Sequence, residues 1–275
     1  LSADLGHEPT QETVQNFTEH FGLNAPFISQ YLGWMSNIFH GNFGTSLRTG
    51  NPILEEFRAR FPATFILALS ALSFALVIGI SLGVLSAVKP DTWVDYLGNL
   101  VASTGIAIPS FWLALLLIFF FSIKLNLLPS FGYGGVIHLI LPTIALGSHQ
   151  VARILRISRE STLDVLGQEY IVFAHAKGLT NKVVVLKHAI RNASNPVVTQ
   201  AGLDLGYLLG GTVIIEQIFG WPGIGSFLLT SVEGRDFPVV ASFVLIIAFL
   251  FVLVNLLVDL SYAIIDPRVN LEEAR

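Results

Sequence analysis

The sequence predicts an all-α fold, a polytopic bundle of transmembrane helices. Of its 275 residues, 53% are hydrophobic and only 12% are charged, whereas a soluble domain carries about 25% charged residues. The mean hydropathy is +0.68. Several uncharged stretches also exceed the roughly 20 apolar residues that a helix needs to cross a bilayer. The absence of cysteine excludes disulfides and thiolate metal sites.

Five stretches are predicted to span the membrane. Pro62 stands at the entry to the first, where a helix tolerates proline in its first turn. Pro109 interrupts the second and predicts a kink or a break there, and Pro142 lies inside the third. The five spans are expected at residues 63–88, 97–123, 136–155, 197–215 and 239–264.

Residues 1–60 are polar and are expected to form an extracytoplasmic cap segment, followed by a transmembrane domain over residues 61–275. Short amphipathic pieces are predicted at residues 10–21 and 26–39. The second piece is rich in aromatic and aliphatic residues, which suits packing on a membrane surface or on a partner. About 60 residues with few core positions would be marginal as an independent domain.

A polar and basic island at residues 160–196 interrupts the apolar sequence. Two short helices are predicted in it, at residues 163–177 and 181–192. Gly178 is expected at the turn between them, because glycine adopts a positive φ after a helix C-terminus without steric cost. The apolar face of such a helix pair must pack either on a partner protein or on the chain's own bundle.

The distribution of Lys and Arg predicts the orientation. If the island and the C-terminus share one face, that face carries ten of the fifteen basic residues, and such an excess marks the cytoplasmic side. The cap then faces outward, and a chain that begins outside without a signal peptide is expected to lack one N-terminal span, making six in the intact protein. The ten residues are Lys89, Arg153, Arg156, Arg159, Lys177, Lys182, Lys187, Arg191, Arg268 and Arg275.

Seven segments, one of which lies largely in the island, occur in an order that is specific for one protein family. They are residues 41–47 (GNFGTSL), 60–64 (RFPAT), 169–199 (EYI, AHAKGL, LKHAIRNA and PVVT), 205–211 (LGYLLGG), 216–225 (EQIFGWPGIG), 236–240 (DFPVV) and 254–268 (VNLLVDL and DPR). From about residue 20 onward, the chain resembles the permease subunits of ABC importers. The resemblance is to the "B" type subunit of the dipeptide, oligopeptide and nickel branch. Two positions depart from the family pattern: Val172 replaces an acidic residue of the general permease loop, and Asp204 replaces a neutral amide.

The resemblance implies an ATP-driven importer in the plasma (inner) membrane of a prokaryote, with this chain forming the translocation pathway for small peptides or related solutes. The expected partners are a sister permease in a heterodimer, two ATP-binding subunits, an extracytoplasmic substrate-binding protein and membrane lipid, but no nucleic acid. The chain is not expected to be an enzyme or to hold a metal or cofactor, since it has no GxxxxGK[ST] sequence and the partner ATPases would bind ATP and Mg. The coupling residues that the resemblance implies in the island are Tyr170, Ala174, Ala176, Lys177, Gly178 and Leu179.

Two further sites are expected. A carboxylate at bilayer depth is costly and usually faces a cavity or a partner. Asp204 is therefore either a pathway residue that attracts a cationic group, or a structural residue that lies near an interface or pairs with a neighbouring helix. In the outer loop at residues 216–238, Trp221, Pro222 and Gly223 are expected to touch the binding protein.

Two other functional classes are weighed against the importer. A secondary transporter or channel would use Asp204 as a coupling carboxylate, but it predicts inverted repeats and more intramembrane charges than the sequence shows. An intramembrane protease needs a nucleophile with a nearby base, and no histidine can be placed beside the serines of the spans.

Overall fold

The computed structural model describes residues 24–265 and confirms the all-α fold for that part of the chain. Apart from helices it contains only one isolated bridge, between Thr45 and Pro52. The predicted amphipathic piece at residues 10–21 lies outside the described residues. The helices, two of which (η1 and η2) are π-helical, are α2 (Phe27–Phe39), α3 (Ile53–Val88), α4 (Trp93–Ala107), α5 (Ser110–Leu117), η1 (Ile118–Lys124), α6 (Gly135–Leu166), α7 (Glu169–Ala176), α8 (Asn181–Val183), η2 (Val184–Ala189), α9 (Ile190–Gly211), α10 (Val213–Phe219), α11 (Ile224–Glu233) and α12 (Phe237–Ile265).

Three helices, α3, α6 and α12, are each long and apolar enough to cross a membrane. Two bent pairs bring the number of candidate spans to five, as predicted. The break at Pro109 bends α4 against α5 and η1 by 104°, and the segment from α8 through α9 bends against α10 by 57°. Pro109 therefore breaks its span rather than kinking it gently.

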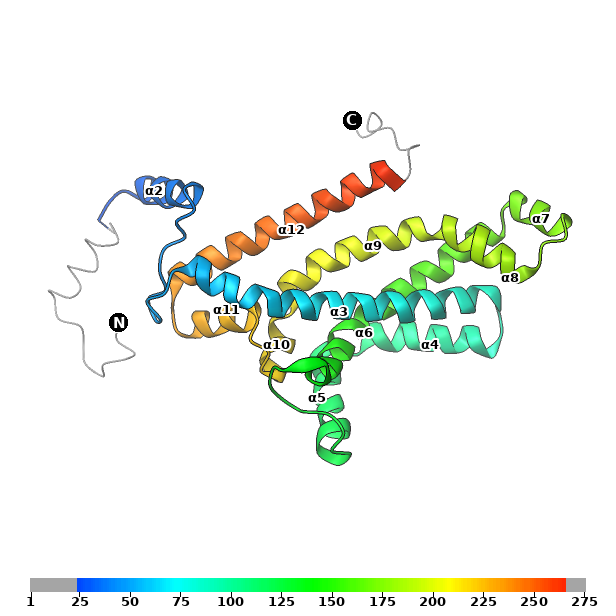
Figure 1. The fold of residues 1–275 in the computed structure, drawn as a ribbon, viewed down its shortest axis with the longest axis horizontal. Helices are drawn as coiled ribbons and strands as arrows, with labels where there is room; N and C mark the ends of the chain where they lie inside the picture. The colour runs from blue at the N-terminus through cyan, green and yellow to red at the C-terminus, as the bar shows by residue number, and fades with distance from the viewer. Residues whose placement is uncertain (1–23, 266–275) are drawn as a thin grey trace.

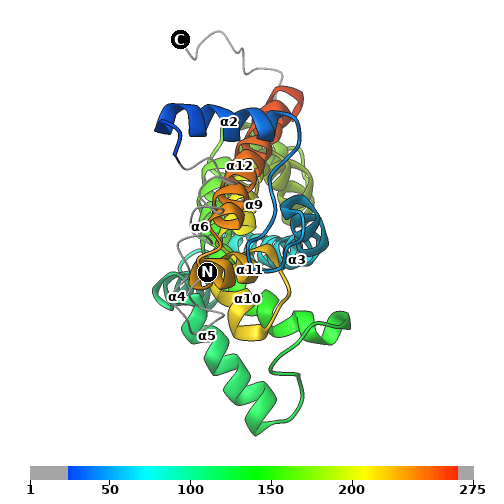
Figure 2. The same cartoon turned by 90° about the vertical axis from the view of Figure 1, so that its left-hand side faces the viewer.

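The long helices run side by side between two ends of the molecule. Figure 1 shows α2 and α11 at one end and α7 and α8 at the other, with α3, α6, α9 and α12 extending between them. Figure 2 looks at the first of these ends, where α2 crosses above the bundle while α5 projects away from it below. We call these the α2 end and the α7 end. The predicted cap and the island thus lie at opposite ends of the bundle.

Three helix boundaries differ from those expected. The first span begins at Ile53, so α3 runs through Pro62 and crosses the expected boundary between cap and membrane domain at residues 60 and 61. In the island, the helix predicted at residues 163–177 is broken at Gly167 and Gln168, where α6 ends and α7 begins. The helix predicted to stop near residue 192 continues through Pro196 to Gly211. A proline removes only one backbone hydrogen bond, and packing on both sides holds these helices together past it.

Close contact between α3 and α6 forms the core of the bundle. Fully buried alanines of α3, such as Ala68 and Ala71, face α6. A Cβ atom at Gly83 would lie 2.6 Å from the carbonyl oxygen of Leu155, and one at Gly147 would lie 2.9 Å from that of Ala71. Small residues allow membrane helices to approach closely, where van der Waals packing rather than hydrophobic transfer holds them together.

A bidentate ion pair fastens α4 to α6 near the α7 end. Arg159 Nε lies 2.6 Å from Oδ1 of Asp95, and Nη2 lies 2.8 Å from Oδ2. Both carboxylate oxygens are engaged, and Asp95 is buried. Two parallel charge-assisted hydrogen bonds fix the relative position of the helices more firmly than a single contact would.

A fully buried carboxylate, Glu216 on α10, organises the α2 end. Its Oε1 accepts hydrogen bonds from the hydroxyls of Thr64 on α3 (2.6 Å) and Thr212 (2.9 Å), and its Oε2 accepts one from the backbone N–H of Ser226 on α11 (2.8 Å). Thr64 Oγ1 in turn accepts a hydrogen bond from the backbone N–H of Ile224. Thr64, Thr212 and Ser226 all donate to the carboxylate, an arrangement that suits its acceptor-only form. We call this cluster the Glu216 node.

Asp236, the residue before α12, makes a second polar junction at the same end. It accepts a hydrogen bond from the hydroxyl of Ser46 at 2.5 Å and another from the backbone N–H of Leu47 at 3.1 Å. Ser242 on α12 donates to the carbonyl oxygen of Phe43 at 3.0 Å. The segment before α3 is therefore tied to the last span.

The α3–α6 contact predicts the effect of one added methyl group. We expect Gly83→Ala to lower the free energy of unfolding by about 1–3 kcal/mol, because the Cβ would collide with the backbone of α6. Gly210→Ala is the control, since its Cβ would meet Ile247 at an ordinary 3.5 Å. Thermal unfolding of the purified protein in detergent measures both, and equal melting temperatures for the two variants would contradict the tight contact.

The Glu216 node predicts a cost for losing one hydroxyl. We expect Thr64→Val, which preserves shape, to destabilise the protein by about 2–3 kcal/mol, because it removes a donor to a buried carboxylate and the acceptor for Ile224 N–H. Thr162→Val is the matched control: Thr162 is also fully buried, but its hydroxyl has no hydrogen-bond partner within residues 24–265. Chemical denaturation of both variants tests this, and a loss at Thr162 as large as at Thr64 would refute the assignment.

Candidate functional site

The island turns back on itself at Gly178, where the predicted positive φ is confirmed at +80°. The turn follows α7, and the backbone N–H of Gly178 donates to the carbonyl oxygen of His175 at 2.9 Å. No atom lies within 4 Å of the position that a Cβ would occupy there. Glycine is therefore the residue that adopts this backbone conformation at the lowest cost, while the space around the turn is open to a partner.

One face of α7 packs on the chain itself. Ile171, Ala174 and Val184 form a small buried cluster against Val165 and Leu166 at the end of α6. Ala174, expected to contact a partner, is only 7% exposed, so in this conformation it supports α7 from beneath. The other expected coupling residues, Tyr170, Ala176, Lys177, Gly178 and Leu179, are exposed.

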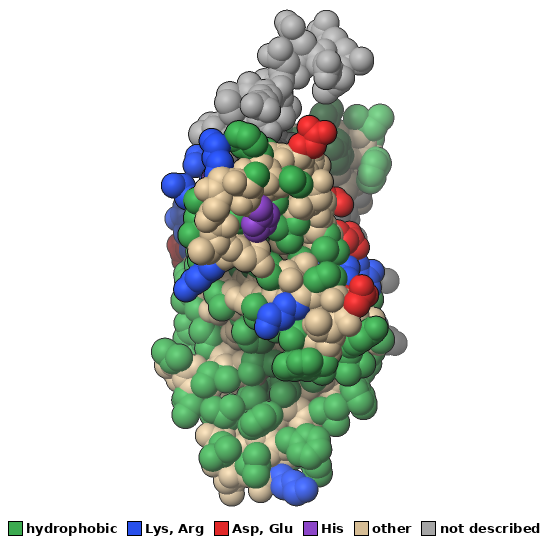
Figure 3. Space-filling view, turned by 90° about the vertical axis from the view of Figure 1, so that its right-hand side faces the viewer, with side chains coloured by type: hydrophobic (Ala, Val, Ile, Leu, Met, Phe, Trp, Pro, Cys, Tyr) green, Lys and Arg blue, Asp and Glu red, His purple; other side chains and the backbone are tan. Residues whose placement is uncertain are grey.

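The outer face of the island carries unpaired apolar side chains. One of them is Phe173, which is 61% exposed, and the ammonium group of Lys177 lies 4.6 Å from the centre of its ring. Figure 3 shows Lys and Arg side chains scattered around this end of the molecule. Exposed apolar groups ringed by charge are typical of a protein interaction site. We call this the docking surface: Tyr170, Val172, Phe173, Lys177, Leu179, Val183 and Leu186.

The docking surface is connected to two long helices. Tyr170 OH accepts a hydrogen bond from Asn192 Nδ2 of α9 at 2.8 Å. The apolar cluster under α7 joins it to α6, and η2 runs without interruption into α9. A force on α7 would therefore reach both α6 and α9.

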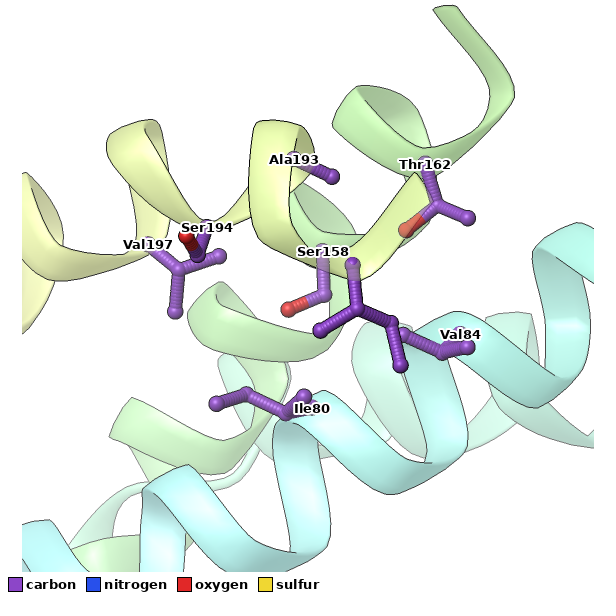
Figure 4. Close-up of a pocket in the computed structure, with 8 residues that line it drawn as sticks. Ile80, Val84, Ser158, Thr162, Ala193, Ser194 and Val197 are labelled. Atoms are coloured by element: carbon purple, nitrogen blue, oxygen red, sulfur yellow. The ribbon is translucent and has the colours of Figure 1, made fainter. Parts of the chain in front are cut away.

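A small cavity of about 50 Å³ lies where α9 leaves the island and passes over α3 and α6. Figure 4 shows its walls: Ile80 and Val84 from α3, Ser158 and Thr162 from α6, and Ala193, Ser194 and Val197 from α9. The hydroxyls of Ser158 and Thr162 have no hydrogen-bond partner within the described range. No polar contact therefore ties α9 to α6 at these two positions.

Asp204 is paired with a residue of a neighbouring helix, one of the two arrangements that the sequence left open. Its Oδ1 lies 2.7 Å from Nη2 of Arg153 on α6 and accepts a hydrogen bond from Gln200 Nε2 at 2.9 Å. Asp204 is 1% exposed, whereas the side chain of Arg153 is 33% exposed. From the sequence, Arg153 is only one of the basic residues of the cytoplasmic face. It lies so far from Asp204 along the chain that no sequence pattern indicates the pair.

The three residues of the outer loop are not equally accessible. Trp221 is 2% exposed, and its Nε1 donates to the carbonyl oxygen of Ala63 at 2.8 Å. Gly223 packs against Glu216, and a Cβ there would lie 2.2 Å from Oε1. Only Pro222 is exposed. Trp221 and Gly223 are packed inside the α2 end, and of the three residues only Pro222 is available for contact with another protein in this conformation. In the sequence, Glu216 is part of the segment at residues 216–225 but has no role of its own, although the glycines around it carry the signal.

Metal-ligating side chains do not gather anywhere in the described part of the chain: no group of three or more His, Asp or Glu residues could hold an ion there.

Known proteins resemble this chain over most of its length. Residues 79–271 match the family described as "Binding-protein-dependent transport system inner membrane component". The chain is 40% identical to the dipeptide transport system permease protein DppB of Alkalihalophilus pseudofirmus, over 97% of this chain and 88% of that protein. It is 40% identical to the glutathione transport system permease protein GsiC of Pectobacterium atrosepticum, over 96% of this chain and 87% of that protein.

A solved structure shows the same fold. The inward-facing MetNI methionine ABC transporter superposes with a TM-score of 0.65 at 19% identity, covering 77% of this chain and 97% of the matched chain. The relatives are transport permeases and not enzymes. The chain therefore belongs to the family of inner-membrane components of binding-protein-dependent transport systems, and it is a permease subunit of an ABC importer.

Proposed function

We propose that this permease subunit forms the pathway for small peptides or closely related solutes across the plasma membrane of a prokaryote. Two relatives of nearly the same length, each 40% identical, are named for dipeptide and for glutathione transport. These solutes share a peptide linkage and a free carboxylate, so the proposal names the class by that shared chemistry.

The observation that carries the mechanism is the docking surface at the α7 end. It exposes apolar side chains that a chain in water would bury, and it joins α6 and α9 directly. We infer that one of two separate ATP-binding subunits docks on this surface and that these subunits bind the ATP and Mg. The chain itself has no GxxxxGK[ST] sequence with which to hold a nucleotide in that way.

Motion would pass from the docking surface to the spans as rigid-body displacement. Tyr170 and Asn192 connect α7 to α9, and Val165 and Leu166 connect it to α6. At the α2 end, by contrast, the Glu216 node and Asp236 hold α3, α10, α11 and α12 together. The proposal is that closure of the ATPases moves the α7 end relative to this fastened end.

The remaining partners follow from the ends and the sides of the bundle. The α2 end, with α2 and Pro222, is the proposed contact for the extracytoplasmic binding protein, so the cap at residues 1–60 and the outer loop at residues 216–238 face outward. The α7 end and the C-terminus then face the cytosol. Exposed apolar side chains along α4, α5 and α12 are available to lipid and to a sister permease in a heterodimer.

The coupling proposal predicts the effect of a charge at the island turn. We expect Gly178→Asp to reduce ATP-driven dipeptide transport in reconstituted vesicles at least about tenfold, which corresponds to about 1.4 kcal/mol of lost interaction. The carboxylate would project into the space a partner must occupy, while the fold survives because aspartate tolerates this backbone region better than most residues do.

Gly41→Asp is the matched control. Gly41 follows α2 as Gly178 follows α7, with φ of +78° and no atom within 4 Å of its Cβ position. The control should retain the ATP-binding subunits during purification, whereas Gly178→Asp should lose them. Retention of the subunits and of transport by Gly178→Asp would rule out the coupling role.

The proposed orientation predicts opposite accessibility at the two ends. The cysteine-free chain provides a background without reactive thiols. In spheroplasts, a membrane-impermeant maleimide should label Arg48→Cys directly but label Lys182→Cys only after permeabilisation. Both positions are exposed, so burial does not explain a difference. Labelling of Lys182→Cys in sealed spheroplasts would reverse the orientation.

A further inference from the structure

The two interhelical ion pairs of the bundle differ in construction. Asp95 and Arg159 are bidentate, and both carboxylate oxygens accept hydrogen bonds. Asp204 and Arg153 meet through one close approach, between Oδ1 and Nη2. Asp204 Oδ2 and Arg153 Nε are left without a hydrogen-bond partner anywhere in residues 24–265. The second pair is therefore poorly built for locking two helices together.

The exposed member of this pair is the cation. Asp204 is 1% exposed, but the Arg153 side chain is 33% exposed. Arg153 Nε and Nη2 are buried, so Nη1 is the only nitrogen of the guanidinium group through which it can reach the surroundings. The ring of Tyr207, itself well exposed on α9, lies 6.0 Å from the guanidinium carbon. The member of the pair whose side chain reaches the surface is thus the cation, and it lies beside an aromatic ring.

Lipid is an unfavourable surrounding for that charge. Both residues lie within candidate membrane spans, and ionisable groups at such depth almost always face a protein interior or a water-filled cavity. Asp204 keeps the guanidinium group in place and offsets part of the cost of burying it. The negative charge of Asp204 is neutralised by this contact, so a cationic group of a solute would have to compete with Arg153 for the carboxylate.

We propose that Arg153 is a solute-contacting residue of the translocation pathway, positioned by Asp204, and that it binds the carboxylate of the passing peptide. The inference rests on the proposed function, since it takes the peptide class as the cargo. A guanidinium group offers planar, permanently charged donors that match a carboxylate. Every free peptide carries such a carboxylate, whatever its side chains, so this contact would favour the class without selecting one sequence.

The test uses the complete importer in vesicles, with L-alanyl-L-alanine and glutathione as transported probes. The main variant is the neutral double substitution Arg153→Gln with Asp204→Asn. It leaves no unpaired buried charge, and replacing a buried ion pair by neutral groups is often harmless to stability. We expect an unchanged melting temperature and at least about a tenfold loss of transport of whichever probe the wild type carries.

Binding-protein docking separates a pathway role from a general defect. The concentration of loaded binding protein that half-maximally stimulates ATP hydrolysis should stay at the wild-type value in the double variant. Arg153→Lys, which keeps the charge and the ion pair, should retain part of the transport. The control is Arg159→Gln with Asp95→Asn, which should lower the melting temperature but leave transport per folded complex close to wild type.

Two results would overturn the inference. One is wild-type transport by the neutral double variant. The other is restored transport in the exchanged variant, Arg153→Asp with Asp204→Arg, because exchange preserves an interhelical pair but makes the exposed charge negative. If the wild-type complex carries neither probe, the proposed peptide function fails instead, and that outcome is visible before any variant is made.

Discussion

The arrangement of this permease depends on a carboxylate that no water can reach. Glu216 is fully buried, and burying an ionised group is tolerable only where donors replace its hydration. The donors come from α3, from Thr212 between α9 and α10, and from α11, so one acceptor on α10 sets the positions of these elements. The buried carboxylate also requires glycine at position 223, because any side chain there would occupy the space of the carboxylate.

This constraint makes the two ends of the bundle unlike each other. At the α2 end, buried polar groups satisfy one another within the chain, and Asp236 adds a tie between the segment before α3 and the last span. At the α7 end, Phe173 and its apolar neighbours are exposed, and a cavity lies where α9 packs on α3 and α6. The proposed coupling requires one end of the bundle that stays fixed and another end that can move. The α2 end and the α7 end meet these two requirements.

The sequence predicts what depends on local composition. The lengths of the apolar stretches predict up to five spans, Pro109 predicts the break and Gly178 predicts the turn, because each feature is determined by residues close together in the chain. The prediction failed where residues far apart in the sequence determine the structure. Helix α9 continues past Pro196 because packing compensates for the missing hydrogen bond, and Trp221 is buried because Ala63 offers it a carbonyl oxygen. The pairing of Arg153 with Asp204 likewise requires the α6–α9 contact, which no periodicity reveals.

That pairing also changes how charge within the bundle is understood. From the sequence, Asp204 is an isolated carboxylate and implies a site for cations. In the structure its charge is matched by Arg153, and the exposed remainder of the pair is positive. Whether an intramembrane ion pair attracts anions or cations therefore depends on which of its two side chains is exposed. A buried anion that positions a partly exposed arginine side chain makes a site for anions, and a peptide carboxylate is the anion common to the solutes for which the relatives are named.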